Sequence, residues 1–111
     1  MTIRLEPLNP PIIIPANGGS FAFDVVSNNA DSSAQTFDVW CKVEVPGGSQ
    51  FTAQGPDFGL TLPPLVNLTR LRSQAVPPGA PAGSYIYWGF VGTYPWTVID
   101  SDNFSFFKEG F

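Results

Sequence analysis

The chain has 111 residues, the usual size of one domain, so we expect a single domain over residues 1–111. Charged residues make up only 13% and hydrophobic residues 43%, a balance that excludes a disordered chain. With a net charge of −4, the chain has no excess of basic residues of the kind that a nucleic-acid binder needs. The absence of histidine excludes catalysis by histidine and metal binding through histidine. No apolar run is long enough to insert into a membrane, and no segment is typical of a signal peptide.

Glycine and proline divide the chain into short segments in which apolar residues alternate with polar ones, a pattern typical of strands. The expected strands, in chain order, are residues 3–8 with 12–14, 20–27, 35–45, 50–54 with 60–62, 65–74, 84–91 and 98–108. Prolines confine the first strand to a sheet edge, because proline cannot donate to a strand ladder. About seven strands separated by regular turns predict an all-β, immunoglobulin-like β-sandwich of two antiparallel sheets.

The alternation also predicts which side chains form the core. The candidates are Phe21, Phe23, Val25, Phe37, Val39, Cys41, Val43, Leu68, Tyr85, Tyr87, Val91, Phe104 and Phe106. Gly89, within the strand over residues 84–91, is expected where another segment approaches closely. Arg70 and Arg72 share one face of their strand and are expected on its solvated side, where they could pair with a carboxylate of a neighbouring strand.

Several short motifs follow one another in a recognisable order. They are NPPIIIPA at 9–16, FAF at 21–23, QTFDVW at 35–40, VPP at 76–78, APAGSY at 80–85, VGTYP at 91–95 and DSDNFSF at 100–106. Together they resemble an immunoglobulin-like module of exported bacterial surface and secreted proteins, which often precedes a C-terminal secretion or anchoring tail. The resemblance implies an extracellular or cell-surface location and an accessory role without catalysis.

Five large apolar side chains are expected on the outer surface of one sheet. If the core assignment holds, the alternating positions place Trp40, Ile86, Trp88, Phe90 and Phe107 outward. Large aromatic residues are favoured at the centre of protein interfaces, so this face is a candidate interaction site. The alternative is that the faces of the strand over residues 84–91 are swapped, which would make its outward residues part of the core.

Two further sites are possible near the C-terminal end. Tyr94 and Trp96 could stack on sugar rings, which would make the chain a carbohydrate-binding module; the alternative is that they cover one end of the sandwich. Asp100, Asp102 and Asn103 could supply oxygen ligands to a structural calcium ion, although the sequence lacks an EF-hand loop. The alternative for these three residues is an ordinary solvated strand.

The sequence therefore predicts a non-catalytic structural or interaction module of an extracellular bacterial protein, and not an enzyme. Its partners would be proteins, either neighbouring domains or copies of itself assembled into a surface fibre. The competing function is carbohydrate binding or adhesion through exposed aromatic residues, with a polysaccharide as the partner. No cofactor is implied apart from the possible calcium ion.

Overall fold

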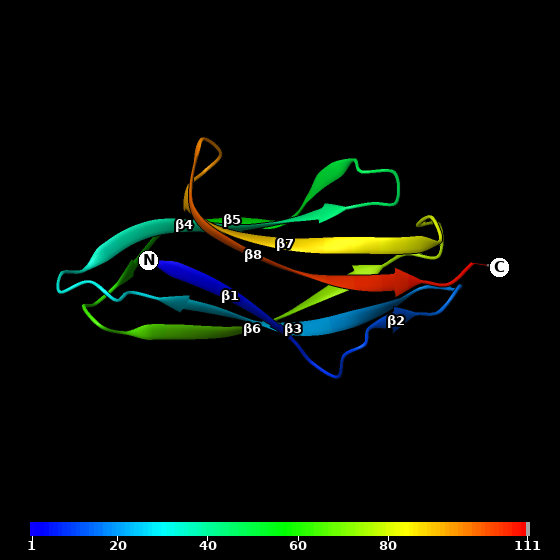
Figure 1. Ribbon diagram of the computed structural model, residues 1–111, viewed down its shortest axis with the longest axis horizontal. Coiled ribbons are helices and arrows are strands. Elements are labelled where there is room, and N and C mark those ends of the chain that lie inside the picture. The colour runs from blue at the N-terminus through cyan, green and yellow to red at the C-terminus, as the bar shows by residue number, and fades with distance from the viewer. Residues whose placement is uncertain (111) are drawn as a thin grey trace.

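A computed structural model describes residues 1–110, which form eight strands and no helix. The strands are β1 (Thr2–Pro7), β2 (Ile13–Ile14), β3 (Gly19–Asn28), β4 (Gln35–Glu44), β5 (Gln50–Leu62), β6 (Asn67–Val76), β7 (Gly83–Thr93) and β8 (Thr97–Lys108). One sheet has the order β1-β3-β6 and the other β2-β8-β7-β4-β5, and Figure 1 shows them as two layers. The predicted all-β sandwich is confirmed. None of residues 1–110 forms a helix able to cross a membrane.

The first strand is split as predicted, and each piece lies at a sheet edge. β1 pairs antiparallel with β3, whereas β2 runs parallel to β8 in the other sheet. The segments 50–54 and 60–62, expected as separate strands, instead form the continuous β5. Its pairing with β4 persists through register shifts between Phe37 and Lys42, so the Gly55-Pro56 break bends this strand without ending it.

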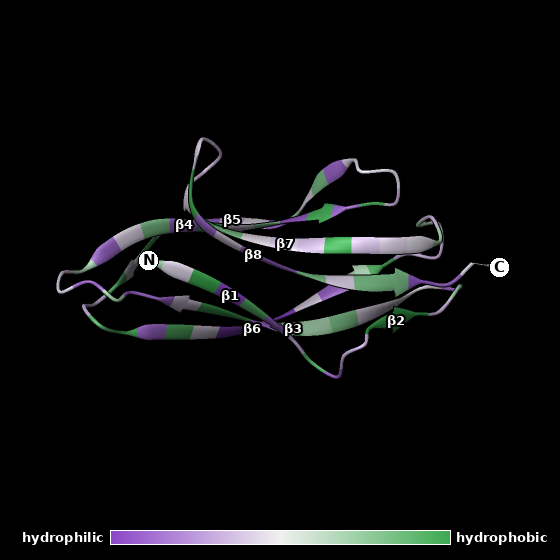
Figure 2. Ribbon diagram, in the orientation of Figure 1, coloured by the Kyte–Doolittle hydropathy of each residue, from purple (hydrophilic) through white to green (hydrophobic). Residues whose placement is uncertain are grey.

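The core lies between the two sheets and is rich in aromatic rings. All thirteen predicted core residues belong to it or pack against it, and Phe23 and Tyr87 are completely buried. The ring centroids of Phe21 and Phe106 lie 4.7 Å apart, and those of Phe23 and Tyr87 lie 5.0 Å apart. Figure 2 shows the underlying alternation of hydropathy along β1 and β6. Burying each such side chain stabilises the fold by roughly 1.5–3 kcal/mol.

One lateral side of the sandwich is closed by contact between β1 and β8. Leu5 of β1 reaches across to Gly89 of β7, where a Cβ atom would lie 2.8 Å from the leucine Cδ2 atom. The predicted close approach at Gly89 is therefore confirmed, and it lets the two sheets come together at this side.

On the opposite side the edge strands β5 and β6 do not pair, and side chains bridge them: the Gln54 Nε2 atom donates to the Ser73 carbonyl at 2.7 Å, and Arg72 pairs with Asp57. A cleft of about 300 Å³ separates these two strands, and we call it the lateral cleft. Arg70 and Arg72 line it; Arg70 is exposed and Arg72 is half-buried. Their predicted contact with solvent is therefore correct, and Arg72 pairs with Asp57 of β5, but the face of β6 that they occupy is the one turned toward the other sheet. Their register partners on β3 are the inward-facing Val25 and Phe23, and side chains opposite each other share a face. Alternation placed the two arginines together but could not reveal that the sheets diverge here.

Candidate interaction surface

A row of aromatic rings crosses the outer face of the five-stranded sheet. Trp88 stacks on Phe90 with centroids 6.0 Å apart, and Phe90 stacks on Trp40 at 5.5 Å. Tyr94 meets Trp40 edge-on at 5.3 Å, and Phe58 meets Tyr94 at 5.9 Å. These five residues, which we call the outer aromatic row, come from β7, β4, the β7–β8 turn and β5. Such offset and edge-on pairs each add about 0.5–1.5 kcal/mol beyond their buried area.

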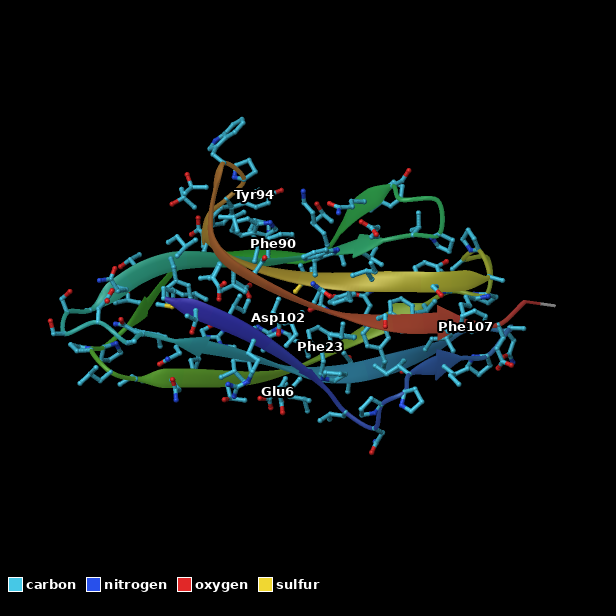
Figure 3. All side chains as sticks on the ribbon, viewed as in Figure 1. Glu6, Phe23, Phe90, Tyr94, Asp102 and Phe107 are labelled. Carbon is cyan, nitrogen blue, oxygen red and sulfur yellow. The ribbon has the colours of Figure 1, made fainter. Side chains whose placement is uncertain are left out.

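Asp38 of β4 fixes the geometry at one end of this row. Its two carboxylate oxygens accept hydrogen bonds from the backbone N–H of Gly59, at 2.9 Å, and of Tyr94, at 3.0 Å. The carboxylate thereby ties β5 and the β7–β8 turn to β4. Figure 3 shows Phe90 and Tyr94 on the outer side of the five-stranded sheet, whereas Phe23 lies between the layers.

The predicted faces of β7 are correct, because Tyr85 and Tyr87 point inward and are buried. The swapped assignment is therefore wrong. Ile86, Trp88 and Phe90 lie outward and are half-buried. The Trp88 indole N–H is covered and has no hydrogen-bond partner among residues 1–110.

The predicted exposure of Trp40 is wrong. Its side chain points outward from the sheet but is only 3% exposed, because Phe90 and Tyr94 pack against it. The β7–β8 turn folds back over the sheet and covers a residue that alternation alone assigns to solvent. Trp40 therefore packs beneath Phe90 and Tyr94 and is not itself accessible to a partner.

Phe107 is 45% exposed but lies apart from the row. It is the register partner of Ile13 in β2, which is 57% exposed, so these two side chains form a small apolar pair at the sheet edge. Phe58 of the row is 65% exposed. Sequence reasoning missed Phe58 because the Gly55-Pro56 break hides which face of β5 it occupies.

Tyr94 and Trp96 do not form one platform. Tyr94 is half-buried between Trp40 and Phe58, whereas Trp96 is 87% exposed at the tip of the turn. The Trp96 backbone N–H donates to the carbonyl of Thr93 at 2.9 Å and closes this turn. Figure 1 shows the turn projecting from the outer face of the sheet. Trp96 is thus the more accessible ring of the two.

The three proposed calcium ligands do not converge. Asp100 accepts a hydrogen bond from the backbone N–H of Ile3 at 2.9 Å, and Asp102 accepts one from Leu5 at 2.8 Å. Asn103 follows Asp102 directly and therefore lies on the other face of β8. Residues 1–110 contain no group of three histidine, cysteine or acidic side chains suited to a metal. The predicted grouping is wrong because both carboxylates hold the edge of β1.

We expect Asp102→Ala to lower the free energy of unfolding by about 2 kcal/mol, because it leaves the Leu5 N–H without its acceptor. Urea unfolding followed by tryptophan fluorescence measures this, with Asp31→Ala as an exposed acidic control. Adding calcium or a chelator should leave the midpoint of the unmodified protein unchanged. A chelator-sensitive midpoint would contradict the structural role of these carboxylates.

Cys41, on the inward face of β4, gives the fold a dependence on alkaline pH. Burial raises the pKa of its thiol from an ordinary 9.0 to about 11. The folded state therefore favours the neutral thiol, and this stabilisation is complete below pH 9 and disappears as the pH rises through 11. We expect the unfolding free energy to fall more steeply between pH 9 and 10.5 in the unmodified protein than in Cys41→Ala. Equal slopes in denaturant titrations would contradict this.

One hydrogen bond made by a tyrosine is typical of a known sandwich architecture. The Tyr85 hydroxyl at the start of β7 donates to the backbone carbonyl of Pro81. A tyrosine hydroxyl that is hydrogen-bonded to the backbone a few residues upstream is a hallmark of immunoglobulin sandwiches.

No protein-family model and no curated protein matches this sequence. Solved structures do match the fold. The CARDB domain of a Pyrococcus furiosus protein, determined with di-metal ions, aligns with a TM-score of 0.60 and 15% identity over 96% of this chain and 90% of that chain. The fold is immunoglobulin-like. An alkylpurine DNA glycosylase from Pseudomonas fluorescens, bound to DNA containing an abasic site analog, aligns with a TM-score of 0.64 and 12% identity over 94% of this chain. A β-glucosidase from Listeria innocua, in complex with gluconolactone, aligns with a TM-score of 0.52 and 15% identity over 98%.

The chain corresponds to 30% of the glycosylase chain and 16% of the glucosidase chain, and so to one part of each. At these identities the likeness concerns the fold alone. An immunoglobulin-like sandwich supports many unrelated functions, so the function has to be argued from the surface of this chain.

Proposed function

We propose that this chain is a non-catalytic module of an extracellular bacterial protein and that it acts by protein contact. The observation that carries the proposal is the outer aromatic row, which ends in the exposed Phe58 and lies beside the projecting Trp96. Aromatic anchors with accessible edges are typical of interface centres, and Asp38 holds this group in place before any partner arrives.

The state of the carboxylates supports a role without catalysis. Asp38, Asp100 and Asp102 all accept hydrogen bonds from backbone N–H groups, so they serve the fold. A general acid or base needs a side chain directed at a substrate, and histidine is absent from the sequence. The net charge of −4 also opposes binding to nucleic acid.

A second copy of the chain is the partner to test first. Light scattering over a concentration series, followed by negative-stain microscopy, should reveal oligomers or fibres. The double variant Phe58→Ser and Trp96→Ser should abolish them, and since both side chains are exposed it should still fold. Leu71→Ser is the matched control, because Leu71 is 62% exposed on the other sheet.

A monomer at every concentration would reject self-assembly through this surface. Assemblies that respond equally to Leu71→Ser would reject the outer aromatic row as the contact. In either case a neighbouring domain of the same protein would be the next partner to test.

Carbohydrate binding is the second candidate, and the 87% exposure of Trp96 favours it. A flat indole on a projecting turn can stack on a sugar ring. The test is retention on an insoluble polysaccharide, which Trp96→Ala should reduce and Leu71→Ala should not. Retention that is unaffected by Trp96→Ala would exclude this role.

A further inference from the structure

The lateral cleft combines an apolar floor with positive charge at its mouth. Val25, Val39, Leu60 and Leu68 supply apolar lining from both sheets. Arg70 and Arg72 supply two guanidinium groups from β6, and Asp57 faces them from β5. The Arg72 Nη2 atom lies 3.4 Å from the Asp57 Oδ2 atom, so one arginine is already paired. Within residues 1–110, the Arg70 side chain forms no hydrogen bond or ion pair.

This charge arrangement is unusual for the molecule. The chain is acidic overall and has only five lysines and arginines, yet two of them line one cleft. Two positive charges and one negative charge leave a formal charge of one positive at its mouth. A single negative charge on a ligand balances that excess, whereas a dianion overcompensates it. The planar guanidinium of Arg70 matches a carboxylate geometrically.

The cleft volume of about 300 Å³ is at the lower end for small-molecule sites. We propose that the lateral cleft binds a monocarboxylate with an aliphatic tail of medium length. The carboxylate pairs with Arg70 at the mouth, and the tail lies against Val39 and Leu68.

Calorimetric titration with octanoate and decanoate tests this proposal directly. Octanoate should bind at least tenfold more tightly than 1-octanol or octylammonium, which have the same tail and lack the negative charge. Decanoate should bind more tightly than octanoate, and acetate should not bind. Acetate that competes as well as octanoate would show that an adventitious ion is the only occupant and would overturn the proposal.

Two variants with equal charge separate the cleft from general electrostatics. Arg70→Gln should weaken octanoate binding by about tenfold or more, since a charge-assisted hydrogen bond is lost. Arg4→Gln makes the same change in net charge on the outer side of β1, and it should have no effect. Equal weakening by both variants would overturn the assignment to the lateral cleft.

Discussion

Replacing Asn29 by alanine is expected to lower the free energy of unfolding by about 3 kcal/mol. Asn29 follows β3 and is completely buried. Its Nδ2 atom lies 3.0–3.1 Å from the carbonyl oxygens of Ser33, Leu62 and Pro63, which share its two hydrogens, and its Oδ1 atom accepts from the Asp31 N–H at 3.0 Å. One side chain thus joins the β3–β4 loop to the end of β5, and its loss leaves several buried polar groups without partners.

Urea unfolding measures this effect, with Asn67→Ala as the control because Asn67 is exposed at the start of β6. Asn29→Asp has nearly the same shape but loses the donors and brings a negative charge to three carbonyl oxygens, so it should be at least as destabilising. If Asn29→Ala unfolded at the same urea concentration as Asn67→Ala, these hydrogen bonds would contribute nothing measurable.

Gly92→Ala should cost about 3 kcal/mol and should also disturb the outer aromatic row. A Cβ atom at Gly92 would lie 2.0 Å from the Thr97 carbonyl oxygen, so β7 and β8 would have to separate. The register between these strands shifts between Val91 and Gly92, directly before the turn that carries Tyr94. Displacing this turn should move the Tyr94 ring away from Trp40 and expose the Trp40 indole to water.

Tryptophan emission and urea unfolding together test this prediction. Gly92→Ala should shift the emission to longer wavelength in the folded state, because Trp40 becomes hydrated. Gly79→Ala is the control, since a Cβ atom there meets nothing within 4 Å. A Gly92→Ala protein with unchanged emission and midpoint would show that the strands accommodate the methyl group without moving the turn.

Alternation in the sequence was sufficient to predict which side chains of β3, β4 and β7 point inward, since each strand packs one face on a continuous core. It did not predict how exposed the outward side chains are. It failed for Trp40, because burial there depends on a turn that returns from residues 93–96. Local pattern contains no signal for such a contact. The same limit applies to Phe58, whose strand is bent at Gly55.

The acidic residues show a second limit. Asp100 and Asp102 looked like free oxygen ligands, but their donors in β1 lie 97 residues away in the sequence. Only the assembled sandwich places the β1 edge beside β8. The inward direction of Arg70 and Arg72 was not predicted for a related reason, although their contact with solvent was. A charged inward face is possible only where the two sheets diverge, and spacing along one strand does not reveal this.

The cleft side of the sandwich also affects how readily a further strand could be added to β6. β6 is an edge strand of ten residues, and such an edge offers unpaired backbone groups to any other exposed strand. A strand added there would extend the sheet and place Arg70, which has no ion-pair partner among residues 1–110, in a lower dielectric, which is costly for an unpaired charge. Inward-pointing charges of this kind discourage edge-to-edge stacking. The position of Arg70 therefore disfavours the addition of a strand at β6.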